Sequence, residues 1–153
     1  MSGFWLFLHM FATTIWIGGG LAVMVAGIAM KKMDRSVWGG VVDAQAAVYR
    51  MLVGPGAMLS VASGVILTFE MYNRLAVKVP PTMGAMQGLG LLGALVILLG
   101  SVPLVGKLSR LEPVGPDAPQ FDRLRVRLAI FGATSGTLGL LALLAGSYYR
   151  YSG

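Results

Sequence analysis

The segment HMFATTIWIGGG, residues 9–20, decides the class of this protein. It belongs to a run from Phe4 to Met30 without any Asp, Glu, Lys or Arg, longer than the roughly 20 residues that a helix needs to cross a bilayer core. The only histidine of the chain, His9, lies inside this run. At about 100° per residue, the polar and small side chains share one side of the expected helix: Trp5, His9, Thr13, Trp16, Gly20 and Gly27. Because lipid offers a polar group no partner, we expect this side to face other helices.

The composition is that of an integral membrane protein. Hydrophobic residues make up 56% of the 153 residues and charged residues 12%, with a mean hydropathy of +0.77. Four apolar runs predict membrane spans at about 4–30, 51–69, 83–106 and 128–149. We therefore predict one all-α membrane domain over residues 1–153, a bundle of four transmembrane helices. The positive charges near the first run follow it rather than precede it, so we expect a retained span and not a cleaved signal peptide.

The net charge of +6 arises from basic residues between the apolar runs, which indicates the lipid bilayer as partner and no nucleic acid. The first and third loops hold most of these residues: Lys31, Lys32, Arg35, Arg50, Lys107, Arg110, Arg123, Arg125 and Arg127. By the positive-inside rule these loops are expected in the cytoplasm. Both termini are then outside, on the periplasmic side of a bacterial inner (cytoplasmic) membrane.

The second span is expected to continue a longer helix. Ser36 is a plausible N-cap, and the helix is expected to bend around Gly54-Pro55-Gly56. In the third loop, three prolines and Gly115 predict that no helix begins before about Asp122.

Small residues share faces of the expected helices, and they allow two interpretations. They recur at Gly56, Ser60 and Gly64, at Gly84 and Gly88, and at Gly132, Gly136, Gly139 and Gly146. Either two backbones approach closely at these positions, or the missing side chains leave room for a flat ligand.

His9 and Gln87 are both expected about 8 Å below the outer surface, at ~1.5 Å per residue along their helices. One interpretation is structural, a hydrogen bond from His9 to Gln87 or to a backbone group. A second is axial ligation of a b-type heme by His9, with Met83, Met86 or Met71 as the sixth ligand or with that position open. A third is Cu(I), which favours thioethers and imidazole.

Other chemistry finds no support in the sequence. The chain has no cysteine, which excludes disulfides and thiolate ligands, and it has no intramembrane carboxylate or phosphate-binding loop. We predict no catalytic residue, and His9 as the metal ligand. The candidate cofactor-binding residues are His9, Trp16, Gly20, Gly64, Met83, Met86 and Gln87.

Several short motifs carry a family resemblance. They are Leu8-His9, Trp16-Ile17-Gly18-Gly19-Gly20, Tyr49-Arg50, Gly54-Pro55-Gly56 and Ser63-Gly64. With these motifs the chain resembles a family of uncharacterised predicted bacterial integral membrane proteins. It is more distantly similar to the four-helix membrane protoporphyrinogen oxidases and to the copper-resistance D membrane family.

The resemblance to the oxidases implies that His9 matches their first-helix histidine, a proposed heme ligand. Arg50 and Pro55 would match the entry motif of their second helix. Those oxidases carry a lysine in the third span, whereas this chain has no lysine between Lys78 and Lys107. The resemblance therefore implies heme or porphyrin binding without the oxidase reaction.

These observations favour a small membrane protein that binds a b-type heme or porphyrin through His9 in a redox role. The alternatives are a non-catalytic accessory subunit, packed in a homo-oligomer or a larger membrane complex, and a Cu(I)-handling protein of the outer leaflet.

Overall fold

The computed structural model describes residues 2–75 and 80–151, and within these residues the chain is helical without any strand. Four helices are long and apolar enough to cross a membrane: Gly3–Met30, Arg35–Tyr72, Pro81–Leu108 and Gly115–Tyr148. The predicted architecture of four long apolar helices is confirmed.

Three of the four long helices are built from shorter elements. The first is α1 alone, Ser2–Met30. The second consists of η1 Arg35–Val37, α2 Trp38–Val48, the π-helical turn η2 Tyr49–Val53 and α3 Gly54–Leu75. The third consists of α4 Pro81–Leu95, the π-helical turn η3 Val96–Ser101 and α5 Val102–Leu108. The fourth consists of η4 Gly115–Asp117 and α6 Ala118–Tyr151.

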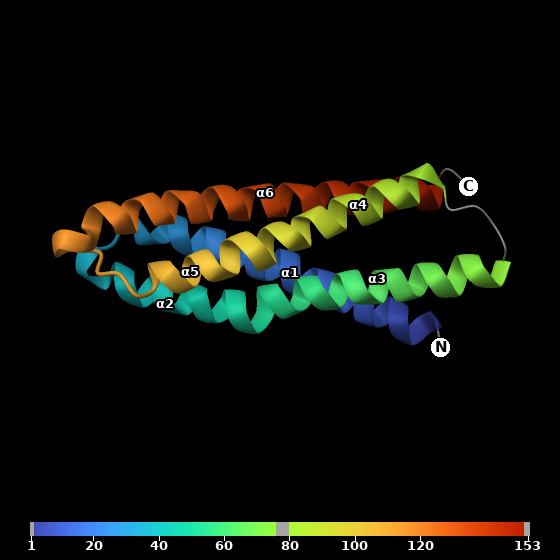
Figure 1. Cartoon of the computed structure of the whole chain (residues 1–153), viewed down its shortest axis with the longest axis horizontal. Coiled ribbons are helices and arrows are strands. Elements are labelled where there is room, and N and C mark those ends of the chain that lie inside the picture. Colours follow the sequence, from blue (N-terminus) through green and yellow to red (C-terminus); the bar gives the residue numbers. More distant parts are fainter. Residues whose placement is uncertain (1, 76–79, 152–153) are drawn as a thin grey trace.

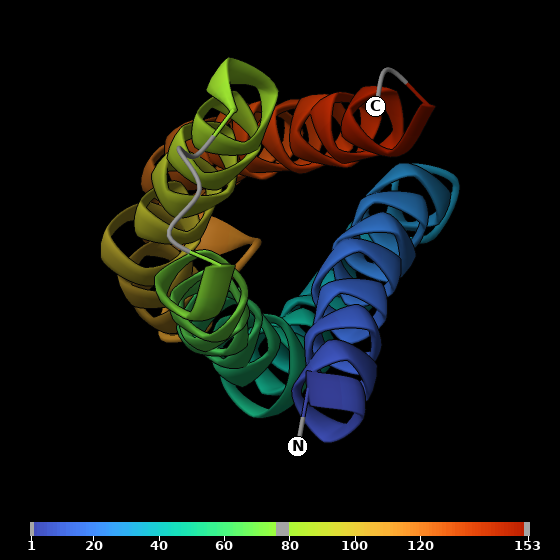
Figure 2. The same cartoon turned by 90° about the vertical axis from the view of Figure 1, so that its right-hand side faces the viewer.

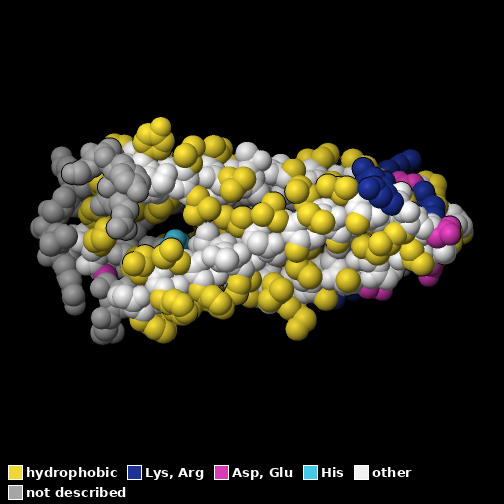
Figure 3. Space-filling model, turned by 180° about the vertical axis from the view of Figure 1, so that it is seen from behind, with side chains coloured by type: hydrophobic (Ala, Val, Ile, Leu, Met, Phe, Trp, Pro, Cys, Tyr) yellow, Lys and Arg dark blue, Asp and Glu magenta, His cyan; other side chains and the backbone are white. Residues whose placement is uncertain are grey.

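The bundle is made of two helix pairs. α1 packs along α3, and α4 packs along α6, whereas the contacts between the pairs are fewer (Figures 1 and 2). Both termini lie at one end, which we call the terminal end. The connections from α1 to α2 and from α5 to α6 lie at the other, where Lys and Arg side chains gather (Figure 3), and we call this the basic end.

The α1–α3 interface is a close approach of two backbones. A Cβ atom at Gly56 would lie 3.1 Å from the amide N of Trp16 and 3.2 Å from the carbonyl O of Ala12. Ser60, one turn further along α3, is buried. Close approach is therefore confirmed at Gly56.

The glycines of α6 differ in the neighbours that an added Cβ atom would meet. Cβ atoms at Gly132, Gly139 and Gly146 would meet Tyr49, Ile17 and Met86, respectively. A Cβ atom at Gly136 would meet nothing within 4 Å. Of the two interpretations, close backbone approach therefore does not hold at Gly136, where the described residues leave open space.

Each π-helical turn is followed by an α-helix whose second residue is proline, Pro55 in α3 and Pro103 in α5. Pro55 and Pro103 have no N–H, and their rings would clash with the carbonyl groups of Met51 and Leu99 in a regular α-helix. The helix widens instead, so that the N–H of Gly54 donates to the carbonyl five residues earlier, that of Tyr49. The predicted irregularity around Gly54-Pro55-Gly56 therefore takes the form of a π-helical turn immediately before it.

Two predicted helix starts are wrong. Ser36 lies inside η1 and is not an N-cap; η1 and α2 begin after Asp34 and Val37, neither of which makes a side-chain capping hydrogen bond. α6 begins at Ala118 rather than near Asp122. Pro119 is tolerated there because the first turn of a helix does not need its N–H groups for internal hydrogen bonds.

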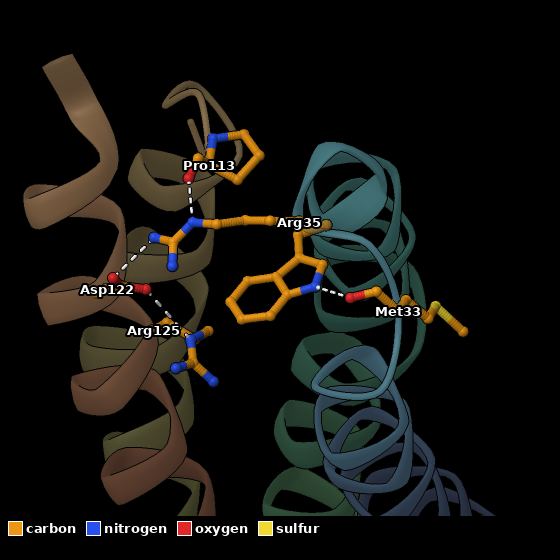
Figure 4. Close-up of polar contacts among 6 residues, drawn as sticks. Met33, Arg35, Pro113, Asp122 and Arg125 are labelled. Atoms are coloured by element: carbon orange, nitrogen blue, oxygen red, sulfur yellow. Dashed lines mark hydrogen bonds and ion pairs between the residues drawn. The ribbon is translucent and has the colours of Figure 1, made fainter. Parts of the chain in front are cut away.

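A polar cluster joins the two helix pairs at the basic end (Figure 4). Arg35 places Nη2 2.7 Å from Oδ2 of Asp122 and donates from Nε to the carbonyl O of Pro113 at 2.5 Å. The guanidinium groups of Arg35 and Arg125 lie 5.1 and 5.0 Å from the ring centroid of Trp38. The cluster therefore fastens the α1–α2 turn to the start of α6.

Candidate functional site

A pocket of about 330 Å³ lies between the two helix pairs, in the half of the bundle towards the terminal end. This volume falls in the range of small-ligand sites. The pocket lining brings together most of the predicted site residues: His9, Trp16, Gly64, Met86 and Gln87. Gly20 and Met83 lie outside the lining. Figure 3 shows a hollow on the side of the bundle, with the histidine side chain at its edge.

His9 is held in one tautomer by α3. Its Nδ1 atom lies 2.8 Å from the carbonyl O of Ser60 and 3.3 Å from Oγ of Ser63. A carbonyl oxygen only accepts hydrogen bonds, so Nδ1 of the neutral ring carries the proton. The other ring nitrogen, Nε2, then has a free lone pair, and it makes no hydrogen bond to the described residues.

Gly64 provides the space for this ring. A Cβ atom at Gly64 would lie 3.1 Å from Cε1 and 3.3 Å from Nδ1 of His9. The imidazole therefore rests directly on the backbone of α3, and any larger residue at position 64 would displace it.

The hydroxyl groups around His9 form a closed network. Thr13 donates to the carbonyl O of His9 at 2.7 Å, and so its Oγ1 accepts from the hydroxyl of Ser60 at 2.6 Å. Ser63 donates to the carbonyl O of Leu59 at 2.6 Å. These bonds hold α1 against α3, and within the described residues they leave Nε2 of His9 without a hydrogen bond.

Gln87 approaches the pocket from the other helix pair. Its side-chain amide donates to Oγ1 of Thr68, which in turn donates to the carbonyl O of Gly64 at 2.9 Å. Of the two structural hydrogen bonds considered for His9, the one to a backbone group is present and the one to Gln87 is not. Gln87 instead ties α4 to α3.

The side chain of Trp16 extends from α1 to α4 and so contacts both helix pairs. Its side chain is buried, and its ring atoms Cζ2 and Cη2 would lie 3.1 Å from a Cβ atom at Gly93. By contrast, Cβ atoms at Gly84, Gly88 and Gly90 would meet nothing within 4 Å, although all three line the pocket. At these three positions the missing side chains leave open space.

Two potential metal-ligating side chains line the pocket, the imidazole of His9 and the thioether of Met86. The Met86 sulfur packs on α6, 2.8 Å from the Cβ position of Gly146. Met83 is buried outside the pocket, and Met71 is exposed near the end of α3. Within residues 2–75 and 80–151, no group of three or more His, Cys, Asp or Glu side chains is placed to hold a metal ion.

Sequence reasoning missed Thr68 and Gly93. Gly56, Ser60 and Gly64 recur every four residues, and Thr68 is the next position in this series, so the same spacing could have identified it. Gly93 had no such signal, because its role depends on the direction of the Trp16 side chain on another helix.

No protein-family model, no curated protein and no solved structure matches this chain.

Proposed function

We propose that this is a four-span protein of the bacterial inner membrane that binds a b-type heme or a related porphyrin through His9 in a redox role. The observation that carries the proposal is the Nδ1–H bond from His9 to the carbonyl O of Ser60, which leaves the Nε2 lone pair free beside a pocket. Metal-ligating histidines in proteins use this arrangement, since the second hydrogen bond fixes the ring and raises its basicity.

The residues of the pocket fit a flat macrocycle. Gly84, Gly88 and Gly90 leave open space on the α4 side, while Trp16 supplies an aromatic surface. When bound, a heme iron would supply one-electron redox chemistry. His9 would hold the iron through Nε2. Met86 would supply a thioether, because Met83 and Met71 do not line the pocket.

The remaining side chains position the imidazole and restrict water. Ser60 and Ser63 hold Nδ1, and Thr13 links His9 to Ser60. The apolar residues Ile17, Val61 and Leu143 complete the wall. A low dielectric and few waters around an axial ligand influence the reduction potential of a bound iron.

A visible spectrum of the protein purified from native membranes tests this function. We expect a Soret band in the wild type and at least a tenfold loss of bound heme in His9→Ala, which removes the ligating nitrogen. Thr14→Ala is the matched control, because Thr14 is exposed on the same helix and its hydroxyl donates to the carbonyl O of Met10, away from the pocket. A colourless wild type, or a band of equal intensity in His9→Ala, would refute the assignment of His9.

We also propose that the basic end faces the cytoplasm and the terminal end the periplasm. The support is the concentration of Lys and Arg in the two connections at the basic end. A cysteine at Ser36 should resist an impermeant thiol reagent in intact cells, whereas a cysteine at Ser152 should react. The opposite labelling pattern would reverse the proposed orientation.

A second candidate function is a non-catalytic accessory subunit. Its support is that Cβ atoms at Gly20 and Gly136 would meet nothing within 4 Å among the described residues, so side chains of another membrane helix could occupy this space on α1 and α6. Co-purification with larger membrane subunits, together with a colourless pocket, would favour this candidate. Copper bound to a colourless protein would instead favour Cu(I) handling at His9 and Met86.

A further inference from the structure

A second cavity, of about 600 Å³, is a groove between α1 and α2 towards the basic end. It shares no residue with the His9 pocket. Its apolar walls include Ala22, Ala26 and Ala29 from α1, Val37 from η1, and Gly40 and Ala44 from α2.

The groove is a fixed part of the fold. Gln45, which is buried in its floor, donates from Nε2 to the carbonyl O of Val23 at 2.9 Å. A Cβ atom at Gly27 would lie 3.2 Å from this same nitrogen, so the absence of a side chain at position 27 makes room for the amide group of Gln45. One buried hydrogen bond therefore sets the separation of the two walls.

The groove is open to the outside of the bundle. The lining residues Gly40 and Ala44 are exposed, and Met33 at the end of the groove is 48% exposed. An exposed apolar groove favours an apolar occupant.

The end of the groove carries positive charge. Lys31 and Lys32 are exposed in the turn between the lining residues Ala29 and Met33. Neither takes part in an ion pair among residues 2–75 and 80–151. Asp34 is exposed in the same turn, so the two lysines leave a net positive charge there.

We propose that this groove binds an anionic diacyl phospholipid, with an acyl chain along the α1–α2 trough and the phosphate beside Lys31 and Lys32. The apolar lining matches the chain, and the unpaired ammonium groups match the headgroup. A zwitterionic lipid would fill the same trough, but the quaternary ammonium of its headgroup would offset the attraction of its phosphate to the lysines.

The test compares lipids added to delipidated protein in a neutral detergent. Phosphatidylglycerol should raise the Tm by about 5 °C, as expected when a lipid well above its Kd binds a folded chain of this length. Phosphatidylcholine with the same acyl chains should raise it by less than half as much. Counting bound lipids by native mass spectrometry provides a measurement that does not depend on stability.

Two variants test separately how much the groove and the lysine charges contribute to lipid binding. Ala44→Leu fills the groove from an exposed lining position, and Ala47→Leu adds the same volume on the exposed surface of the same helix outside the groove. Ala44→Leu and the double variant Lys31→Gln/Lys32→Gln should each reduce phosphatidylglycerol binding at least threefold, while Ala47→Leu should bind like wild type. Equal binding of both lipids, or full binding by Ala44→Leu, would overturn the proposal; a loss in the lysine variant alone would mean headgroup attraction without the groove.

Discussion

Gly56→Leu should prevent α1 and α3 from packing together, and it is the substitution with the largest expected effect on stability. A side chain at position 56 would meet the backbone of Trp16 and Ala12 at 3.1–3.2 Å, and a helix backbone cannot move aside as a flexible side chain can. The overpacking should cost about 3 kcal/mol, near the upper end for inserted volume. For a chain of this length we expect the Tm in detergent to fall by about 10 °C, measured by circular dichroism.

Gly136→Leu is the matched control for this prediction. It introduces the same side chain into a helix at a glycine whose Cβ would meet nothing within 4 Å. Its Tm should stay within about 2 °C of wild type, because no described atom has to move to admit the side chain. If the two variants lost equal stability, the α1–α3 interface would not be the closest backbone contact of the bundle.

Gly88→Leu should close the His9 pocket without unfolding the protein. Gly88 lines the pocket from α4, and a Cβ atom there has open space around it, so the leucine can occupy the volume proposed for the porphyrin. We expect at least a tenfold loss of bound heme, measured from the Soret absorbance per protein. The Tm measured without heme should change by less than about 2 °C, because no protein atom is displaced.

Gly20→Leu is the control for pocket closure. Gly20 also has open space around it, but it lies on α1 outside the pocket lining. Heme content should therefore remain that of the wild type. A loss of heme in Gly20→Leu with none in Gly88→Leu would place the ligand beside Gly20 instead of in the His9 pocket.

The long helices of this fold are predictable because each leaves a strong local signal. The apolar run from Phe4 to Met30 contains no charge to interrupt it, and α1 ends where Lys31 begins. The helix starts were less predictable. Ser36 has the residue type of an N-cap, but η1 begins one residue earlier, and no side chain caps it. The second π-helical turn was missed although Pro103 stands inside an apolar run.

The candidate site could be predicted only in part. His9 and Gln87 were expected at a similar height because height follows from position along a helix, and both line one pocket. The partner of His9 could not be identified, because it is the backbone carbonyl of Ser60, a group that every residue has. Likewise, Gly132 and Gly136 both lack a side chain, and only the arrangement of neighbouring helices distinguishes the packed glycine from the open one.

The division into two helix pairs has a consequence for the order in which the protein forms during synthesis. The most extensive helix contacts join α1 to α3 and α4 to α6, so each pair is a hairpin of consecutive chain. The N-terminal hairpin contains both His9 and Ser60, and it leaves the ribosome before the second hairpin does. The imidazole therefore acquires its hydrogen bond and its tautomer in a hairpin that has no pocket yet. The cavity that its free nitrogen faces exists only once the second hairpin has inserted beside the first.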